Sequence, residues 1–114
     1  MQKKIQSAVA LYSSGQAKKA LDIAESLIID FPNEAIIYNL SGACFSALED
    51  YENAENSYRK ALLINNDYAE VHNNLGVCLQ NLGNYEDAID CYMNAITVNA
   101  NYAEPHNNLG NTYK

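Results

Sequence analysis

The chain has 114 residues, 48% of them hydrophobic, and a formal net charge of -7 at pH 7, so it holds enough apolar material for a packed core. Its seven Lys and Arg residues are scattered, which argues against nucleic acid and anionic membrane surfaces as partners. No apolar run approaches the ~20 residues that a membrane span needs, and no apolar signal core follows Met1, so a cytoplasmic protein is predicted.

The most informative feature of the sequence is a repeat of 34 residues. Gly42, Gly76 and Gly110 are separated by this interval, and so are Ala54 and Ala88. A fixed period of this length is the signature of a repeat architecture. The interval divides the chain into units 1–34, 35–68 and 69–102, and a remainder 103–114 that supplies only the first third of a fourth unit.

The first two units each predict a helical hairpin. In the first unit, apolar residues recur at helical spacing on both sides of a polar turn that contains Gly15. Pro32 ends the second helix of that unit, and residues 65–67, which are Asn-Asn-Asp, end the second helix of the next one. The connections between units are therefore expected to be short.

The third unit repeats this pattern most clearly. Helices are predicted over residues 69–82 and 85–98, each with an apolar stripe on one face. Gly76 and Ala88 are small, which predicts that the two helices cross closely at these positions. Residues 103–114 are expected to form one more helix, with no second helix to cover it.

The repeated residues resemble the tetratricopeptide repeat. The third unit carries the signature at His72, Leu75, Gly76, Leu79, Ala88, Tyr92 and Ala95. The first unit departs from the pattern, with Lys4 at the aromatic position and Ala8 at the glycine position, as expected of a terminal unit. The resemblance implies an all-α, right-handed superhelical solenoid of helix-turn-helix repeats, in which the first helix of each unit lines a concave groove.

The resemblance also assigns positions in each unit to the groove, which should change from apolar to amide-rich along the chain. An Asn side chain both donates and accepts, so a ladder of them can hold the backbone of an extended peptide. Asn74 and Asn108 resemble the asparagine ladder in the repeat arm of O-linked N-acetylglucosamine transferases. Leu40, at the equivalent position one unit before Asn74, departs from that ladder. The alternative is that Asn73 and Asn107 only solvate a helix face. The candidate groove residues are Asn39, Leu40, Asn73, Asn74, Val77, Asn107, Asn108 and Asn111.

A second known use of such repeats is a clamp that holds the acidic C-terminal tails of heat-shock chaperones. The clamp needs Lys and Arg inside the groove. This sequence instead places Glu70 and Glu104 at groove positions. Acidic peptides should therefore be repelled, and neutral or basic proteins are the partners that the charge favours.

No constellation in the sequence predicts an enzyme. His72 and His106 occupy the same position in successive units, roughly 10 Å apart, which is too far for a shared metal ion, and both are expected to be packing residues. Cys44, Cys78 and Cys91 lack the spacing of a zinc or redox motif and are expected to be buried. We therefore expect no catalytic residues, no metal and no cofactor.

The sequence leaves three functional interpretations open. The first is a protein-interaction module that binds an extended peptide of a partner protein. The second is the substrate-docking arm of a larger glycosyltransferase or sulfotransferase. The third is a scaffold that forms homo-oligomers, because Leu109 and Tyr113 are expected to lie on an uncapped end helix.

Overall fold

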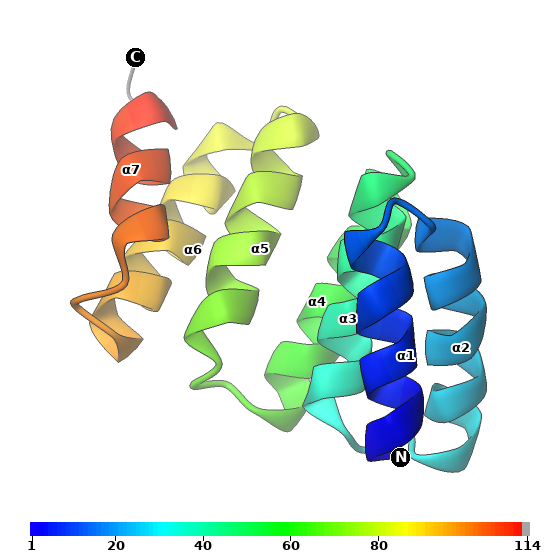
Figure 1. Cartoon of the computed structure of the whole chain (residues 1–114). Coiled ribbons are helices and arrows are strands. Elements are labelled where there is room, and N and C mark those ends of the chain that lie inside the picture. The colour runs from blue at the N-terminus through cyan, green and yellow to red at the C-terminus, as the bar shows by residue number, and fades with distance from the viewer. Residues whose placement is uncertain (113–114) are drawn as a thin grey trace.

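The computed structural model describes residues 1–112, which form α-helices and no strand (Figure 1). The helices are α1 Gln2–Ser13, α2 Ala17–Asp30, α3 Ala35–Ala47, α4 Tyr51–Ile64, α5 Ala69–Asn81, α6 Tyr85–Val98 and α7 Ala103–Thr112. The all-helical prediction is confirmed. The second helix of the third unit has the predicted bounds, 85–98, and the first ends one residue before the predicted Leu82, which caps it.

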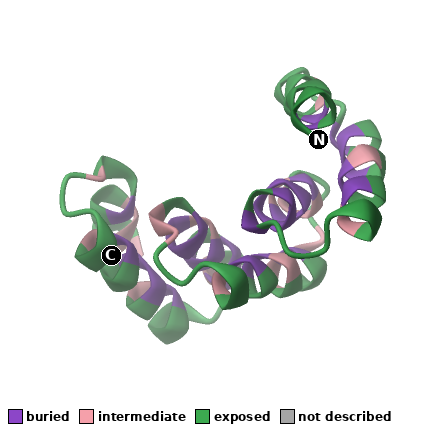
Figure 2. Ribbon diagram, turned by 90° about the horizontal axis from the view of Figure 1, so that it is seen from below, coloured by how far each residue is buried: buried purple, intermediate pink, exposed green. Residues whose placement is uncertain are grey.

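The helices stack in chain order. The closest pairs are the hairpins α3 with α4 and α5 with α6, and each hairpin then packs on the next. Figure 2 shows from below that the stack follows an arc, with the two termini at opposite ends and the buried residues on the facing sides of the helices. The arrangement leaves a concave side, and the molecule measures 38 × 25 × 21 Å.

Two hydrophobic clusters hold the stack together. One joins α1 and α2 to α3, and its centre includes Ile37, which is fully buried. The other joins α3 and α4 to α5 and α6, and its largest fully buried side chain is Tyr92. Since each cluster spans a junction between hairpins, the same apolar contacts that close a hairpin also fix its neighbour.

The two repeated glycines mark the close crossing of the helices in a hairpin. A Cβ atom at Gly76 would lie 2.5 Å from a ring carbon of Tyr92, and one at Gly42 would lie 2.5 Å from a ring carbon of Tyr58. Both tyrosines belong to the same hairpin as their glycine. The predicted need for a small residue at Gly76 is confirmed, because the tyrosine ring occupies the space of a side chain.

A second repeated contact ties each linker to the helix that follows it. One side chain in the first turn of α3, α5 and α7 bonds a carbonyl oxygen six residues earlier, at 2.7 to 3.0 Å. These bonds join Tyr38 to Pro32, His72 to Asn66 and His106 to Ala100. His72 is buried, as predicted. The same prediction is wrong for His106, which is exposed because no described helix lies beyond α7.

The turn inside each hairpin has the same backbone geometry. In every case the residue at position 15 of the unit has a positive φ, which is 82° at Gly15, 61° at Glu49 and 83° at Gly83. The amide of the next residue bonds the carbonyl five residues earlier at 2.8 to 2.9 Å, which closes a Schellman motif. Glu49 therefore has a backbone conformation that favours glycine.

Replacing Glu49 with glycine is expected to stabilise the protein. A left-handed conformation costs a residue with a Cβ about 1–2 kcal/mol, of which the extra flexibility of an unfolded glycine offsets a part. We expect Glu49→Gly to raise the free energy of unfolding by about 0.5–1 kcal/mol in urea titrations. Glu49→Ala is the control, since it removes the carboxylate and keeps the Cβ. An equal gain from Ala would show that charge, not φ, is responsible.

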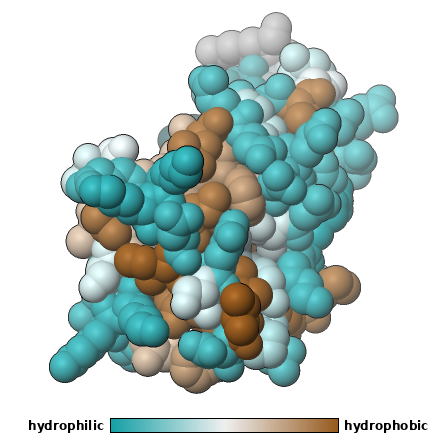
Figure 3. All heavy atoms as spheres, turned by 90° about the vertical axis from the view of Figure 1, so that its right-hand side faces the viewer, coloured by the Kyte–Doolittle hydropathy of each residue, from teal (hydrophilic) through white to brown (hydrophobic). Residues whose placement is uncertain are grey.

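Several apolar side chains stay on the surface. Figure 3 faces the side on which α1 and α2 lie and shows apolar patches among hydrophilic side chains. In α1, Val9 and Tyr12 are 46% and 38% exposed.

No helix within residues 1–112 combines the length and the apolar character that crossing a bilayer requires.

Candidate functional site

The first helices of the units line a common groove. Residues of α1, α3, α5 and α7 surround a hollow with a volume of about 500 Å³. Its apolar lining comes mainly from Ile5, Val9, Ile36, Leu40 and Val77. Its polar lining comes mainly from Asn39, Asn73, Asn74, Asn108, Glu70 and Glu104. The predicted change from apolar to amide-rich therefore lies within one continuous surface.

The apolar end of the groove contains both buried and exposed apolar side chains. Ile5 and Leu40 are nearly buried, at 5% and 7% exposed. Val9 and Ile36 are 46% and 43% exposed and line the same hollow. A ligand that covered these two side chains would remove their apolar surface from water.

The amides at the other end are paired across the units. Asn74 donates from Nδ2 to Oδ1 of Asn39 at 3.1 Å, and Asn108 donates to Oδ1 of Asn73 at 3.0 Å. Asn73 also donates from its own Nδ2 to Oε2 of Glu104 at 3.3 Å. The side chain of Asn73 is only 2% exposed. The alternative that Asn73 solvates a helix face is therefore wrong, since its amide is buried between units.

The pairing leaves part of the predicted ladder available. Asn74 and Asn108 are half-buried, and each uses one N–H group to bond its neighbour. Their carbonyl oxygens accept no hydrogen bond from the described residues. Each amide can thus still offer an acceptor, held in place by Asn39 or Asn73, to a molecule in the groove.

The remaining predicted positions lie elsewhere. Asn107 and Asn111 are exposed on α7 and do not line the groove. Leu109, predicted at the open end, is half-buried and packs against the cluster that contains Tyr92. Tyr113 lies outside the described residues.

The groove also includes residues that were not among the predicted ones. They include Tyr12, Ser46, Tyr58 and Tyr68. Tyr12 and Ser46 stand at the twelfth position of their units, which the repeat assigns to the groove, so the signal was present. Tyr68 precedes α5 and therefore lies outside the helical positions that the repeat pattern describes.

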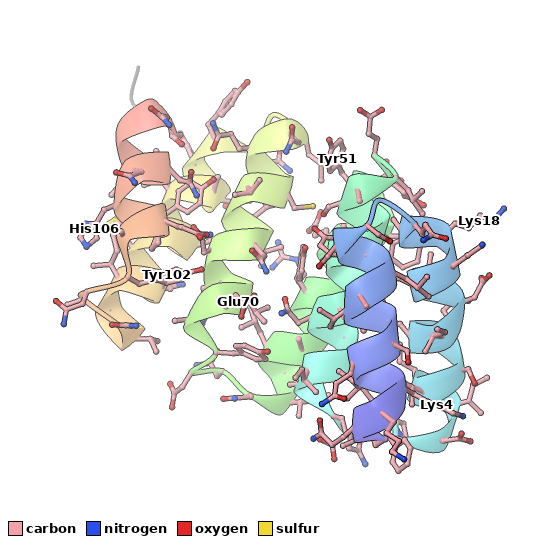
Figure 4. The ribbon with its side chains drawn as sticks, in the orientation of Figure 1. Lys4, Lys18, Tyr51, Glu70, Tyr102 and His106 are labelled. Atoms are coloured by element: carbon pink, nitrogen blue, oxygen red, sulfur yellow. The ribbon has the colours of Figure 1, made fainter. Side chains whose placement is uncertain are left out.

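The carboxylates give one end of the groove a negative potential. Burial, followed by the nearby charges of Glu104 and Glu70, raises the pKa of Tyr102 to about 12. Burial, followed by the charge of Glu70, also raises the pKa of Tyr68. In Figure 4, Glu70 and Tyr102 lie on the α5 and α7 side, whereas Lys4 and Lys18 lie at the opposite end of the stack.

The cysteines lie in the packed interior. Cys44, Cys78 and Cys91 are buried, as predicted, and form no disulfide. Burial raises the pKa of each thiol to about 11. The thiol of Cys78 also donates to the carbonyl oxygen of Tyr51 at 3.0 Å. Within residues 1–112, no three His, Cys, Asp or Glu side chains gather closely enough to hold a metal ion.

Comparison with protein families identifies the repeat. A tetratricopeptide repeat family model matches residues 69–102, and a second TPR repeat model matches residues 42–83. The chain therefore contains tetratricopeptide repeats, and the helical repeat solenoid is confirmed. Domains of this kind are typically non-catalytic protein-interaction modules. No curated protein sequence matches the chain closely enough to count as a relative.

Solved structures share the fold over nearly the whole chain. The first TPR of Spaghetti (RPAP3) bound to the HSP90 peptide SRMEEVD has a TM-score of 0.94 and 17% identity, covering 98% of this chain and 89% of that one. The second TPR domain of human RPAP3 with the HSP70 peptide SGPTIEEVD has a TM-score of 0.92 and 15% identity, covering 97% and 92%. The Sgt2 TPR domain from Aspergillus fumigatus has a TM-score of 0.93 and 20% identity, covering 98% and 76%.

At such identities the likeness shows the fold alone. The resemblance to the repeat arm of O-linked N-acetylglucosamine transferases finds no support in these comparisons. The solenoid fold is therefore shared with the solved structures.

Proposed function

We propose that this chain is a protein-interaction module that binds an extended peptide segment of a partner in the groove between α1, α3, α5 and α7, with no catalytic step of its own. The observation that supports it most directly is the hollow of about 500 Å³, which combines exposed apolar side chains with held amides. Two similar structures carry peptides of chaperones, which shows that this fold can hold a peptide.

The amides supply contacts that do not depend on the peptide's sequence. Asn74 and Asn108 stand one unit apart and keep their carbonyl oxygens for backbone N–H groups of the ligand. Since Asn39 and Asn73 already fix their orientation, little side-chain entropy is lost when a peptide binds.

The apolar end supplies most of the affinity. Covering a side chain such as Val9 or Ile36 contributes up to roughly 1.5–3 kcal/mol for full burial, and both are already about half covered. A peptide that binds this module should therefore carry apolar side chains at the α1 and α3 end.

Both chaperone peptides in the similar structures contain the acidic sequence EEVD. Glu70 and Glu104 in this groove disfavour such a ligand.

Replacing Asn74 and Asn108 together with alanine tests the proposal. The probes are 12-residue peptides that the wild-type protein selects from a random phage library, synthesised and measured by isothermal titration calorimetry. We expect the double variant to bind all of them about tenfold more weakly, whatever their side chains, because each amide contributes roughly 0.5–1.5 kcal/mol.

The matched control replaces two amides of α7 that do not line the groove, Asn107 and Asn111. Circular dichroism at the assay temperature checks that both proteins are folded. Unchanged affinity of the Asn74→Ala, Asn108→Ala variant would contradict the backbone contact. A wild-type protein that selects no peptide would contradict the function itself.

A further inference from the structure

One carboxylate in the groove accepts hydrogen bonds from two neighbouring side chains. Oε2 of Glu104 accepts from Nδ2 of Asn73 at 3.3 Å and from the hydroxyl of Tyr102 at 3.4 Å. Asn73 is buried, so its amide cannot turn away to bond with water. The second oxygen, Oε1, accepts no bond from the described residues and remains available.

A second carboxylate stands one unit away. Glu70 lines the groove together with Glu104, and both also line an adjoining hollow with Asn74 and Tyr102. The two carboxylates therefore border the same space between α5 and α7.

Neither carboxylate has a cationic partner in the described part of the chain. Within residues 1–112 no Lys or Arg lines the groove, and the ion pair between Arg59 and Glu55 lies on α4. Residues 69–102 contain four acidic side chains and no Lys or Arg. The labelled lysines of Figure 4, Lys4 and Lys18, lie at the other end of the stack.

We propose that the groove takes a segment with apolar side chains at its α1 and α3 end and a Lys or Arg side chain at its α5 and α7 end, with the cation bound between Glu70 and Glu104. This inference rests on the proposed function and states the chemistry of the partner. The raised pKa of Tyr102, to which both carboxylates contribute after burial, agrees with a negative potential at this place.

The geometry sets the spacing in the ligand. Packed helices have an interaxial distance of about 8–10 Å, so we expect the centre of the α5 and α7 end to lie about 20 Å from the centre of the α1 and α3 end. An extended peptide advances about 3.3 Å per residue. The cationic residue is therefore expected about six residues from the apolar ones.

Three synthetic 12-residue peptides test the inference. They share Leu and Val at one end and differ only six residues further on, where they carry Arg, Gln or Glu, and each is made in both sequence directions. Fluorescence anisotropy at 0.15 M salt should show that the wild-type protein binds the Arg peptide about tenfold more tightly than the Gln peptide, with the Glu peptide weakest.

The variant Glu70→Gln with Glu104→Gln should bind the Arg and Gln peptides with affinities within about twofold of each other. The control, Glu86→Gln with Asp87→Asn, removes two exposed charges from the first turn of α6, away from the groove, and should keep the preference.

The outcomes separate this inference from the proposed function. Equal binding of the Arg and Gln peptides by the wild-type protein overturns the inference and leaves peptide binding intact. The same holds if no designed peptide binds while library-selected peptides do. If the control variant also loses the preference for the Arg peptide, that preference depends on the overall charge of the protein and not on the two groove carboxylates. The inference then fails as well.

Discussion

Tyr92→Ala is expected to lower the free energy of unfolding by about 3–5 kcal/mol, the largest effect of any change considered in this protein. The ring is fully buried in the cluster that joins α3 and α4 to α5 and α6. Its hydroxyl donates to Oε1 of Gln80 at 2.8 Å. Removing the ring leaves a cavity at the crossing of α5 and α6 and leaves the carbonyl of Gln80 with one fewer donor.

Urea denaturation followed by circular dichroism measures this loss. The control is Tyr85→Ala, the same change on the same helix, at a side chain that is 56% exposed. It should alter stability by no more than about 0.5 kcal/mol. Similar losses for the two variants would contradict the packing described for Tyr92.

Gly76 provides a second arm of the same test. In the wild-type protein, Gly76→Ala sets a Cβ 2.5 Å from the buried ring, so crowding should outweigh the gain in helix propensity. In the Tyr92→Ala background the ring is absent, and the same change should stabilise the protein by up to about 1 kcal/mol. Additive effects would show that the two positions do not touch.

The fold could be predicted because the positions that determine it repeat. Gly42 and Gly76 recur at the interval of the units, and a small residue at this position has one main physical cause, the approach of a second helix. The first turn was predicted from Gly15, whose φ is positive. Glu49 carries the same positive φ without glycine, so the second turn was recognisable only from its place in the repeat.

The groove could be predicted only in outline. Residue type and position indicated that Asn74 and Asn108 face the concave side, and both line it. Their bonds to Asn39 and Asn73 join residues 35 positions apart in sequence, so they depend on how far one hairpin is displaced along the next. The repeat pattern gives the order of the units and not that displacement, so it could not show which amides are already paired.

The exposure of Asn107 has a related cause. Asn73 and Asn107 occupy the same position of successive units, and the sequence treats them alike. The structure buries Asn73 beneath α7 and leaves Asn107 on the surface, because no described helix follows α7. Equivalent positions therefore differ in role according to their neighbours, which a single unit cannot encode.

This difference gives the second large effect. Asn73→Ala should lower the free energy of unfolding by about 1–3 kcal/mol, since it removes the bonds to Asn108 and Glu104 from a buried site. Asn107→Ala is the matched control and should change stability by less than about 0.5 kcal/mol, with alanine's higher helix propensity partly favouring it. Equal effects in thermal and urea unfolding would show that burial does not distinguish the two amides.

A double replacement tells whether the amide pair is needed for stability or for the groove. Two units before Asn73 and Asn108, the equivalent positions are occupied by Ile5 and Leu40, which belong to one hydrophobic cluster. Replacing both partners of a buried hydrogen bond by apolar groups of similar shape is often nearly neutral. Asn73→Ile with Asn108→Leu should therefore recover most of the stability that Asn73→Ala loses. This variant removes the buried donor to Glu104 and the side-chain carbonyl of Asn108, so it should still bind peptides more weakly. Recovery of both stability and binding would contradict the positioning role of Asn73.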